Sequence, residues 1–495
     1  MATDTQAHSL LSTGKLAALI IGPLLVLVPL FVPAPADMPD PAWRLVGLTA
    51  WMVVWWLSEV VPLAATSLLP LPFMPLLVIT DADATASSYA DPLIFLFLGG
   101  FLIAAAMQRW DLHRRIALNI VNVVGTSPAR IIGGFMLATA FLSMWISNTA
   151  TSVMMFAVGI ALINYLSENS SDDGKIRNFG VALMLGIAYS ASIGGVATLI
   201  GTPPNALLAS FIADSYDVQI GFATWMLVGL PIVVVMLPVA WFWLTHFAFS
   251  IKGMELGEAR EVIEKEIDEL GEMSRGERVV LVVFVTTALL WILRSLLSDF
   301  IGLAISDTAI AIAAGVALMA IPLSRSEGTF VLDWETARTQ VPWGVLLLFG
   351  GGLALAGAFQ ETGLAEYIGA AVEGFQNVNI WWIVLIVSVL IILLTELTSN
   401  TATTATFLPI MGAIAVGLGQ DPLLLAVPTA IAASMAFMMP VATPPNAIVF
   451  GYKELRIADM VKAGAVLNLL TIAIVFAAMY FLVPLVFGLQ VGTGG

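Results

Sequence analysis

Two short polar motifs interrupt long apolar stretches of this sequence. The pentapeptide SNTAT occupies residues 147–151 after FMLATAFLSMWI, and it returns at 399–403 after VSVLIILLTELT. Ser, Asn and Thr supply neutral oxygens that suit a hard cation such as Na⁺, and Asn and Thr also supply donors that suit a carboxylate. Neither motif contains Lys or Arg, so an anion would be held by amides, hydroxyls, helix N-termini and co-bound cations. The motifs therefore predict joint binding of cations and an anion.

A second pair of motifs follows the first. GTPPNAL occupies residues 201–207, and ATPPNAI occupies 442–448. Paired prolines remove two N–H donors and prevent a helix from continuing, which leaves carbonyl oxygens free to bind a cation. Irregular backbone at membrane depth is tolerated only inside protein or beside a water-filled cavity. Each TPPN motif thus predicts a broken helix.

Both kinds of motif also have a simpler interpretation, because small polar residues in membrane helices often serve helix packing alone. Two symmetric copies, each paired with a TPPN break, favour the binding interpretation. Two intramembrane acids need an explanation as well. We interpret Glu59 as a helix-end acid that reaches interfacial water, and Glu396 as a residue that organises its hairpin through hydrogen bonds or tunes cation affinity. Coupling to protons through Glu396 is the minority alternative.

The composition sets the class of protein. Of the 495 residues, 59% are hydrophobic and only 11% are charged, whereas a soluble protein carries about 25% charged residues. Apolar runs of about 20 residues recur along the chain and are long enough to cross a bilayer. The net charge of −15 argues against nucleic acid as a partner. The HExxH, GxSxG and Walker patterns are missing, so nothing suggests an enzyme.

We therefore predict an all-α polytopic membrane protein with about 11 transmembrane helices and two re-entrant hairpins. The hairpins are residues 131–166 and 378–418, each with an SNT motif at its tip. The other membrane segments are expected near 16–33, 43–62, 64–80, 93–109, 179–212, 223–249, 279–298, 302–322, 343–360, 422–452 and 461–487.

Positive charge predicts the orientation in the membrane. With a cytoplasmic N-terminus and two re-entrant hairpins, all 19 Lys and Arg residues except Arg44 and Arg294 lie on the cytoplasmic side. This arrangement predicts a multi-pass protein of the cell's inner (plasma) membrane. The first apolar run also resembles a signal peptide, but it is longer than usual and reads better as a helix. Residues 251–278 are charged and predict a cytoplasmic amphipathic linker.

The chain contains an internal repeat. FLGGFLIAAAMQRWDL (97–112) matches FGGGLALAGAFQETGL (349–364), and both this match and the two SNT motifs are displaced by 252 positions. Four repeated features occur in the same order. We predict a tail and first helix (1–40), a first repeat (41–250), the linker and a second repeat (279–488). Each repeat holds five crossings, an odd number, so the second is inverted relative to the first, as in secondary transporters.

The sequence resembles the divalent anion/sodium symporter (DASS) family of sodium-coupled dicarboxylate transporters. The resemblance covers residues from about 40 to 487 and rests on WWLSEVVPLAATSLLPL (55–71), LSMWISNTAT (142–151), IGTPPNAL (200–207), LTELTSNTAT (394–403) and PVATPPNAIVFG (440–451). It implies a homodimer in which a transport domain carrying both hairpins moves as an elevator against a scaffold.

The resemblance also implies residue roles. The substrate carboxylates would be bound by Asn148, Thr149, Asn400, Thr401, Thr443 and Pro444. At least two Na⁺ sites are expected. One would be formed by Ser143, Ser147, Asn148 and the carbonyl of Gly201, and the other by Thr395, Thr398, Asn400 and the carbonyl of Ala442.

The function expected from these patterns is sodium-coupled import of C4-dicarboxylates such as succinate, fumarate and malate. The first alternative is the same fold with another dianion (sulfate, tartrate or citrate) or with exchange activity. The second alternative, from a different class, is an anion channel, because inverted halves with broken helices also occur in channels.

Overall fold

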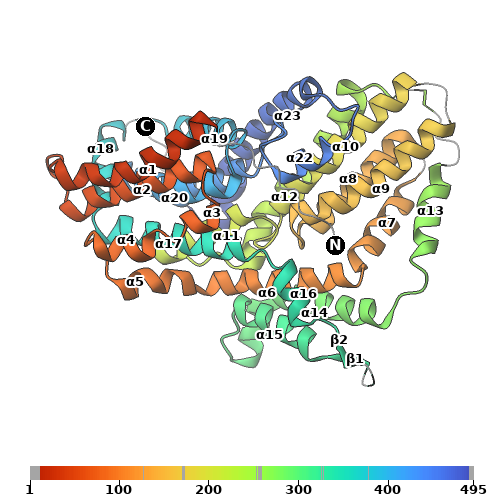
Figure 1. Cartoon of the computed structure of the whole chain (residues 1–495), viewed down its shortest axis with the longest axis horizontal. Helices are drawn as coiled ribbons and strands as arrows, with labels where there is room; N and C mark the ends of the chain where they lie inside the picture. The colour runs from red at the N-terminus through yellow and green to blue at the C-terminus, as the bar shows by residue number, and fades with distance from the viewer. Residues whose placement is uncertain are drawn as a thin grey trace.

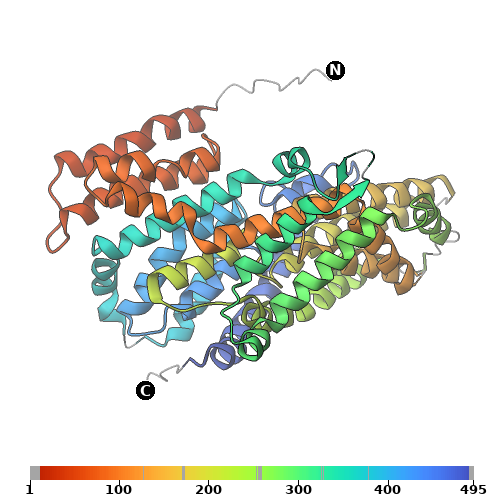
Figure 2. The ribbon, with the colours of Figure 1, turned by 90° about the horizontal axis from the view of Figure 1, so that it is seen from below.

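The computed structural model describes residues 12–489, apart from residues 126, 170–172, 252, 255–258, 325, 327 and 377. Regular structure within these residues is almost entirely α-helical (Figures 1 and 2). The exception is a short antiparallel ribbon of β1 (Pro322–Ser324) and β2 (Thr329–Phe330). This ribbon is a small departure from the predicted all-α class.

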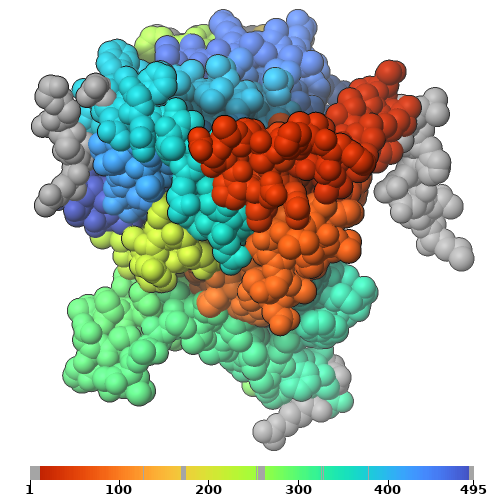
Figure 3. All heavy atoms as spheres, turned by 90° about the vertical axis from the view of Figure 1, so that its left-hand side faces the viewer, coloured from red at the N-terminus to blue at the C-terminus, as the bar shows by residue number. Residues whose placement is uncertain are grey.

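The N-terminal helices form one side of the molecule. They are α1 (Thr13–Phe31), α2 (Asp40–Ser58), α3 (Leu63–Thr66), α4 (Pro70–Leu76) and α5 (Ala82–Ser87). Helix α1 packs against α2 and otherwise exposes apolar side chains. In the space-filling view of Figure 3 this N-terminal part of the chain, in red, lies at the surface. Tryptophans of α2 provide the packing, since Trp55 Nε1 donates to the carbonyl of Ala18 in α1 (3.2 Å). The predicted membrane segment at 64–80 corresponds to the apolar stretch Leu63–Leu76, which is formed by the two short helices α3 and α4, and Pro70 is the first residue of the second.

The next helices carry the first hairpin and the first broken helix. They are α6 (Pro92–Arg109), α7 (Leu112–Val124), α8 (Pro128–Ser143), α9 (Asn148–Asn169), α10 (Asp173–Gly195), α11 (Pro203–Tyr216) and α12 (Phe222–Phe242), the last extended by a π-helical turn at Trp243–Ala248. Helices α8 and α9 are the predicted hairpin. The predicted segment 179–212 is indeed two helices, α10 and α11.

The middle of the chain carries α13 (Ala259–Glu269), α14 (Arg275–Ile301), α15 (Asp307–Ala320) and α16 (Trp334–Gln340). Helix α13 is the amphipathic helix expected in the linker, and it packs on α7 and α9. Arg115 of α7 fixes this region, since it bonds the carboxylate of Glu277 (2.6 Å) and the carbonyl of Gly271 (2.9 Å). Arg294, one of the two exceptions to the charge pattern, pairs with Asp307 (3.1 Å).

The remaining helices carry the second hairpin and the second broken helix. They are α17 (Trp343–Glu361), α18 (Leu364–Val372), α19 (Ile380–Thr395), α20 (Asn400–Gly417), α21 (Leu423–Ala433), α22 (Pro444–Val449), α23 (Ile457–Ala477) and, after a π-helical turn, α24 (Val483–Phe487). Helices α19 and α20 are the predicted hairpin 378–418. Helices α21 and α22 divide the predicted segment 422–452.

Helix boundaries in the two halves follow the displacement read from the sequence. Helices α7 and α18 begin 252 positions apart, and the same holds for α8 and α19 and for α9 and α20. The repeat-related side chains Phe97 and Phe349 also contact each other edge to face, with ring centroids 5.0 Å apart. The two halves thus carry the same sequence of elements, and α6 and α17 meet at equivalent residues.

Membrane crossing is consistent with the lengths and composition of these helices. Eight helices among the described residues are long and apolar enough to span a bilayer, and five shorter apolar helices accompany them. The shorter ones include the first arms of both hairpins, α8 and α19. The predicted number of about 11 crossings stays a prediction, because broken helices cross in two pieces.

Candidate functional site

The first hairpin gathers oxygen atoms at its tip. Helix α8 ends at Ser143 and α9 begins at Asn148. The Ser143 hydroxyl lies 2.5 Å from an amide atom of Asn148 and 2.7 Å from the carbonyl oxygen of Ala191 in α10. The same amide atom lies 3.2 Å from the carbonyl oxygens of Ala191 and Gly201. Three of the four residues predicted for this sodium site, Ser143, Asn148 and Gly201, are therefore in contact.

The orientation of the Asn148 amide decides what this cluster contains. If the inward amide atom is nitrogen, it donates to Ser143 and to both carbonyls. If that atom is oxygen, it lies within 3.2 Å of a hydroxyl and two carbonyl oxygens. Carbonyl, amide and hydroxyl oxygens are the kinds of ligand that hard cations bind. The orientation of this one amide therefore decides whether the cluster is fully hydrogen-bonded or contains excess acceptor oxygens.

The second hairpin repeats this geometry. Helix α19 ends at Thr395 and α20 begins at Asn400. The Thr395 hydroxyl lies 2.6 Å from Asn400 Oδ1 and 2.7 Å from the carbonyl oxygen of Ala433 in α21. A hydroxyl has one proton and can donate to only one of these two acceptors at a time. The tip therefore holds more acceptor oxygens than protons, and a bound cation would remove that excess.

Both tips also present the N-terminus of a long helix. Helices α9 and α20 start at the two asparagines, so unpaired N–H groups and the positive ends of the helix dipoles face the tips. Such ends favour an anion without help from a basic side chain. Each tip thus combines a cluster of neutral oxygens with the N-terminus of a long helix.

The two broken helices have their irregular segments immediately before the TPPN motifs. The first break is residues 196–202, between α10 and α11, and the second is residues 434–443, between α21 and α22. The prolines start the second half-helices, where a missing N–H costs nothing, and the break itself lies upstream of them. The sequence predicted that each helix is interrupted at its prolines. In the structure the interruption lies a few residues before them.

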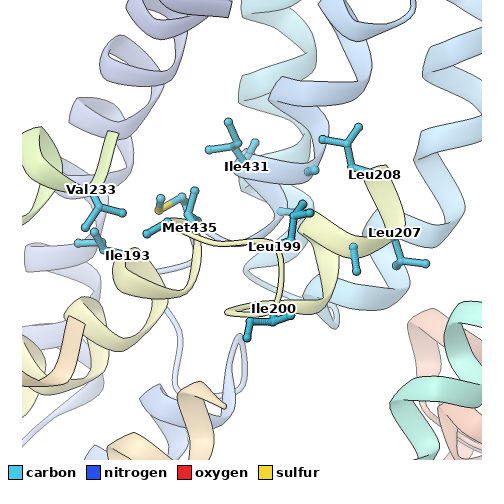
Figure 4. Close-up of a cluster of buried hydrophobic side chains, with 14 of the residues drawn as sticks. Ile193, Leu199, Ile200, Leu207, Leu208, Val233, Ile431 and Met435 are labelled. Atoms are coloured by element: carbon cyan, nitrogen blue, oxygen red, sulfur yellow. The ribbon is translucent and has the colours of Figure 1, made fainter. Parts of the chain in front are cut away.

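The asparagine of each TPPN motif holds its own break. Asn205 Nδ2 donates to the carbonyl of Thr198 (2.8 Å), and Asn446 Nδ2 donates to the carbonyl of Met439 (2.9 Å). Apolar side chains from both halves surround the first break, among them Leu199 of the break and Ile431 of α21 (Figure 4). Buried amides and tight packing thus fix backbone that no helix holds.

The broken helices bring the two halves together. Helix α11 of the first half packs against α20 and α21, and α22 of the second half packs against α9 and α10 (Figure 1). Tyr189 of α10 also contacts Phe437 of the second break, with ring centroids 5.0 Å apart. Each break therefore leads the chain from its own half to the hairpin of the other half.

The residues predicted to bind substrate differ in exposure. Thr149 and Pro444 are exposed, whereas Asn148, Asn400 and Thr401 are half-buried. Thr443 is buried, and its hydroxyl accepts the backbone N–H of Asn446 as the N-cap of α22 (3.4 Å). The exposed and half-buried members are the first residues of α9, α20 and α22. Helices α9 and α20 also offer backbone N–H groups there, whereas α22 begins with two prolines, which have none.

Two predicted sodium ligands have hydroxyls that make other contacts. The Ser147 hydroxyl accepts from the N–H of Ala150 (3.3 Å). Ala442, whose carbonyl is the predicted ligand, is buried, and its N–H donates to the carbonyl of Met439 (3.2 Å). The Thr398 hydroxyl donates to Leu394 and contacts the hydroxyl of Thr403 (2.7 Å). The side chains of Ser147 and Thr398 therefore do not face the oxygen clusters described above. The hydroxyls of Thr403 and Thr404 also bond within the hairpin.

The two intramembrane acids follow their sequence interpretations. Glu59 comes directly after α2 and is exposed, as expected of a helix-end acid. Glu396 is buried and accepts hydrogen bonds from the second break, as expected of an organising residue. The sequence interpretation missed the carbonyls of Ala191 and Ala433, because an alanine side chain carries no sign of what its backbone does.

Known membrane transporters resemble this chain in sequence or in fold. Residues 13–487 match the model of the family described as "Sodium:sulfate symporter transmembrane region". The chain is 42% identical over 486 residues to the sodium-dependent dicarboxylate transporter SdcS of Staphylococcus saprophyticus, an alignment that covers 97% of this chain and 93% of that protein. SdcS of Staphylococcus aureus strain MRSA252 gives the same identity and coverage.

Solved structures share the fold at low sequence identity. MtrF of Neisseria gonorrhoeae, described as an antimetabolite efflux pump, has a TM-score of 0.58 at 10% identity and covers 92% of this chain and 96% of its own. The YdaH transporter of Alcanivorax borkumensis has a TM-score of 0.54 at 15% identity, with 91% and 99% covered. The family match and the 42% identical relatives show that this chain belongs to the divalent anion/sodium symporter (DASS) family.

Proposed function

We propose that this protein is a sodium-coupled symporter that imports C4-dicarboxylates such as succinate, fumarate and malate. One observation carries the proposal: each hairpin tip places a hydroxyl, an amide and a carbonyl oxygen beside the N-terminus of a long helix. Neither tip has a basic side chain, so the anion depends on helix ends and co-bound Na⁺. The relatives named as sodium-dependent dicarboxylate transporters support the substrate class.

The proposed substrate site lies between the two tips. Asn148 and Thr149 bind one carboxylate, Asn400 and Thr401 bind the other, and Thr443 and Pro444 complete the site. A dianion with two separated carboxylates fits two repeat-related tips, because each tip supplies one set of donors. Coupling then follows directly, since a cation at each tip offsets the charge of the carboxylate bound beside it.

The proposed sodium sites follow the two oxygen clusters. The first uses Ser143, Asn148 and the carbonyls of Gly201 and Ala191, with Ser147 at its edge. The second uses Thr395, Asn400 and the carbonyls of Ala433 and Ala442. Thr398 takes part through its backbone, because its hydroxyl is bonded to Leu394 and Thr403.

Transport is proposed to occur by an elevator movement of the hairpins and broken helices. Support comes from the boundary between α17 and its neighbours α11 and α20. It is lined by small and apolar residues, with a void of only about 10 Å³ among Leu207, Gly352, Ala405 and other apolar residues. Around this void the boundary is formed by small and apolar side chains, which favours sliding of one surface over the other.

The remaining features of the proposal follow the sequence. The two halves, 41–250 and 279–488, are inverted repeats joined by the linker 251–278. The protein is a homodimer in the plasma membrane with its N-terminus in the cytoplasm. A single cysteine introduced in the linker, labelled from either side of right-side-out vesicles, tests this orientation: labelling from outside contradicts it.

Uptake into proteoliposomes tests the function. An inward Na⁺ gradient should drive labelled succinate above its equilibrium concentration. Uptake that never exceeds the equilibrium concentration indicates a channel. Uptake that does not depend on Na⁺ but requires dicarboxylate inside the vesicles indicates exchange. Sulfate is the second candidate substrate, because the matching family model is described by sodium:sulfate symport. A competition experiment against labelled succinate decides between them, with unlabelled succinate, fumarate, malate, sulfate, tartrate and citrate as competitors. Stronger competition by sulfate than by the dicarboxylates would contradict the proposed substrate class.

A further inference from the structure

The buried side chain of Glu396, at the end of the first arm of the second hairpin, accepts hydrogen bonds from several backbone N–H groups. Its side chain is only 4% exposed and follows Thr395, the last residue of α19. Oε1 accepts the N–H groups of Phe437 (2.7 Å) and Met438 (2.9 Å), and Oε2 accepts those of Met438 (3.0 Å) and Met439 (3.0 Å). Three consecutive residues of the second break are therefore bonded to one carboxylate.

A side chain of another helix completes this carboxylate site. Asn468 of α23 donates its Nδ2 to Glu396 Oε1 (2.7 Å), and Asn468 is itself buried. Hydrogen bonds to an ionised acceptor are the stronger kind, and four donors satisfy the charge of a buried carboxylate. Glu396 thus connects α19, the second break and α23.

These bonds also fix the opposite side of the break. Because the N–H groups of residues 437–439 point toward Glu396, the carbonyls of the preceding peptide groups point away from it. Asn446 Nδ2 bonds one of these carbonyls, that of Ala436 (3.2 Å), and also the carbonyl of Met439 in the following peptide group (2.9 Å). The peptide group between Ala436 and Phe437 is therefore held from both sides, and the break ends with Ala442 and Thr443.

Helix α23 is shaped to receive the break. A Cβ atom on Gly464 would lie 2.2 Å from the carbonyl oxygen of Phe437, so only glycine permits this approach. Gly464 and Asn468 are four residues apart and share one face of α23. The same face that touches the backbone of the break thus also donates to its carboxylate.

The first half holds its break without any charge. Met144 occupies the position equivalent to Glu396, and its carbonyl accepts the hydroxyl of Thr198 (2.5 Å). Trp225 of α12 donates to the carbonyl of Val196 (2.9 Å), and Gly229 of the same helix allows the close approach. The first break is therefore held by hydrogen bonds between neutral groups, whereas the second is held by a carboxylate.

We propose that Glu396 and Asn468 act as a positioning pair for the second sodium site. The pair binds neither ion nor substrate. It sets the backbone of the second break against α19, and so places the Ala442 carbonyl relative to Thr395 and Asn400. The first site, held by neutral groups, does not depend on it. This inference rests on the proposed function and assigns a distinct support to one of its two cation sites.

Two measurements test the pair. The first is the sodium-dependent rise in melting temperature of the purified protein without substrate, and the second is the Na⁺ activation curve of succinate uptake. Glu396→Gln keeps the shape but offers its backbone donors one uncharged oxygen. We expect the Na⁺ concentration for half-maximal response to rise about tenfold or more, as for a lost bond to a charged group. The KM for succinate at saturating Na⁺ should stay within about twofold.

Asn468→Asp gives a readout that a purely structural role would not produce. Two facing carboxyls share a hydrogen bond only when a proton lies between them. We therefore expect the sodium response of this variant, measured without substrate, to strengthen as the pH falls, and more steeply than that of the wild type. Thr471→Val and Met144→Leu are matched controls, on α23 and at the equivalent position of the first half, and both should keep the wild-type curve.

Several results would overturn the proposal. One is a wild-type sodium response in Glu396→Gln, and another is a sodium response of Asn468→Asp that does not depend on pH. If Glu396→Gln does not fold, the sodium responses of Asn468→Asp and Asn468→Ser are measured in its place. Wild-type uptake that ignores Na⁺ contradicts the proposed function instead, and the substrate-free melting measurement keeps that failure separate from failure of the positioning pair.

Discussion

The repeat-related hydroxyls Ser143 and Thr395 offer a direct test of the sodium sites. Thr395→Val removes a hydroxyl but keeps the branched shape of the side chain. It leaves Asn400 Oδ1 and the carbonyl of Ala433 without the contact that each now makes at 2.6–2.7 Å. Ser143→Ala does the same in the first half, where the partners are Asn148 and Ala191.

The size of the effect follows from what is lost. A neutral intramolecular hydrogen bond contributes about 0.5–1.5 kcal/mol net, and a buried acceptor left unpaired costs about 1–3 kcal/mol. Loss of one hydroxyl ligand should therefore weaken Na⁺ binding by about 1–3 kcal/mol, which is about 5- to 150-fold in Kd. Because both hydroxyls have equivalent surroundings, we expect effects of similar size from the two variants.

The assay is the Na⁺ dependence of succinate uptake in proteoliposomes, with the sodium-dependent rise in melting temperature as a second measurement. Each single variant should shift the curve to higher Na⁺, and the double variant should shift it further, by an amount close to the sum of the two free energies. Ser388→Ala is the control, because its hydroxyl bonds only its own helix α19 (2.8 Å to Val384). A wild-type sodium curve for Thr395→Val and Ser143→Ala would refute the ligand sets.

Three further predictions concern other parts of the molecule. Gly229→Ala places a Cβ atom 2.3 Å from a carbonyl oxygen of the first break and should cost about 1–3 kcal/mol of stability, seen as a lower melting temperature. Thr149→Ala removes an exposed hydroxyl and should raise the KM for succinate about fivefold or more without changing the sodium-dependent rise in melting temperature; an unchanged KM contradicts its role. The N–H of Thr336 and the nearby Arg109 lower the pKa of Asp333, so its contribution to stability is present above the unfolded pKa of about 3.9 and is lost as the pH falls through the folded value. Asp333→Ala should therefore melt earlier at neutral pH, with a difference that narrows in acid.

Much of the site could be predicted because its determinants are side chains. Ser143, Asn148, Thr395 and Asn400 carry the oxygens themselves, and the displacement of 252 positions pairs them without any structure. The hairpins could be predicted for the same reason, since an amide between two hydroxyls is costly inside an apolar helix unless the helix ends there. Helices α9 and α20 begin at these asparagines.

Other features have no such signal. The carbonyls of Ala191 and Ala433 belong to the oxygen clusters because of how α10 and α21 pack, which a pattern of residue types does not specify. The membrane segments expected from the sequence do not include α7 and α18, which are helices of 13 and 9 residues. Their contacts with α8 and α20 stabilise them, and tertiary packing of this kind contributes more than intrinsic propensity.

The buried carboxylate of Glu396 is explained by the length of the second break. The first break, residues 196–202, satisfies backbone N–H groups by local turns, such as those from Val196, Ala197 and Gly201 to carbonyls three residues earlier. The second break is longer, residues 434–443, and the N–H groups of residues 437–439 bond Glu396 instead. A carboxylate near a dianion site is repulsive in principle, but here four donors compensate its charge. An acid is therefore compatible with anion transport where its lone pairs are committed to the backbone that shapes the site.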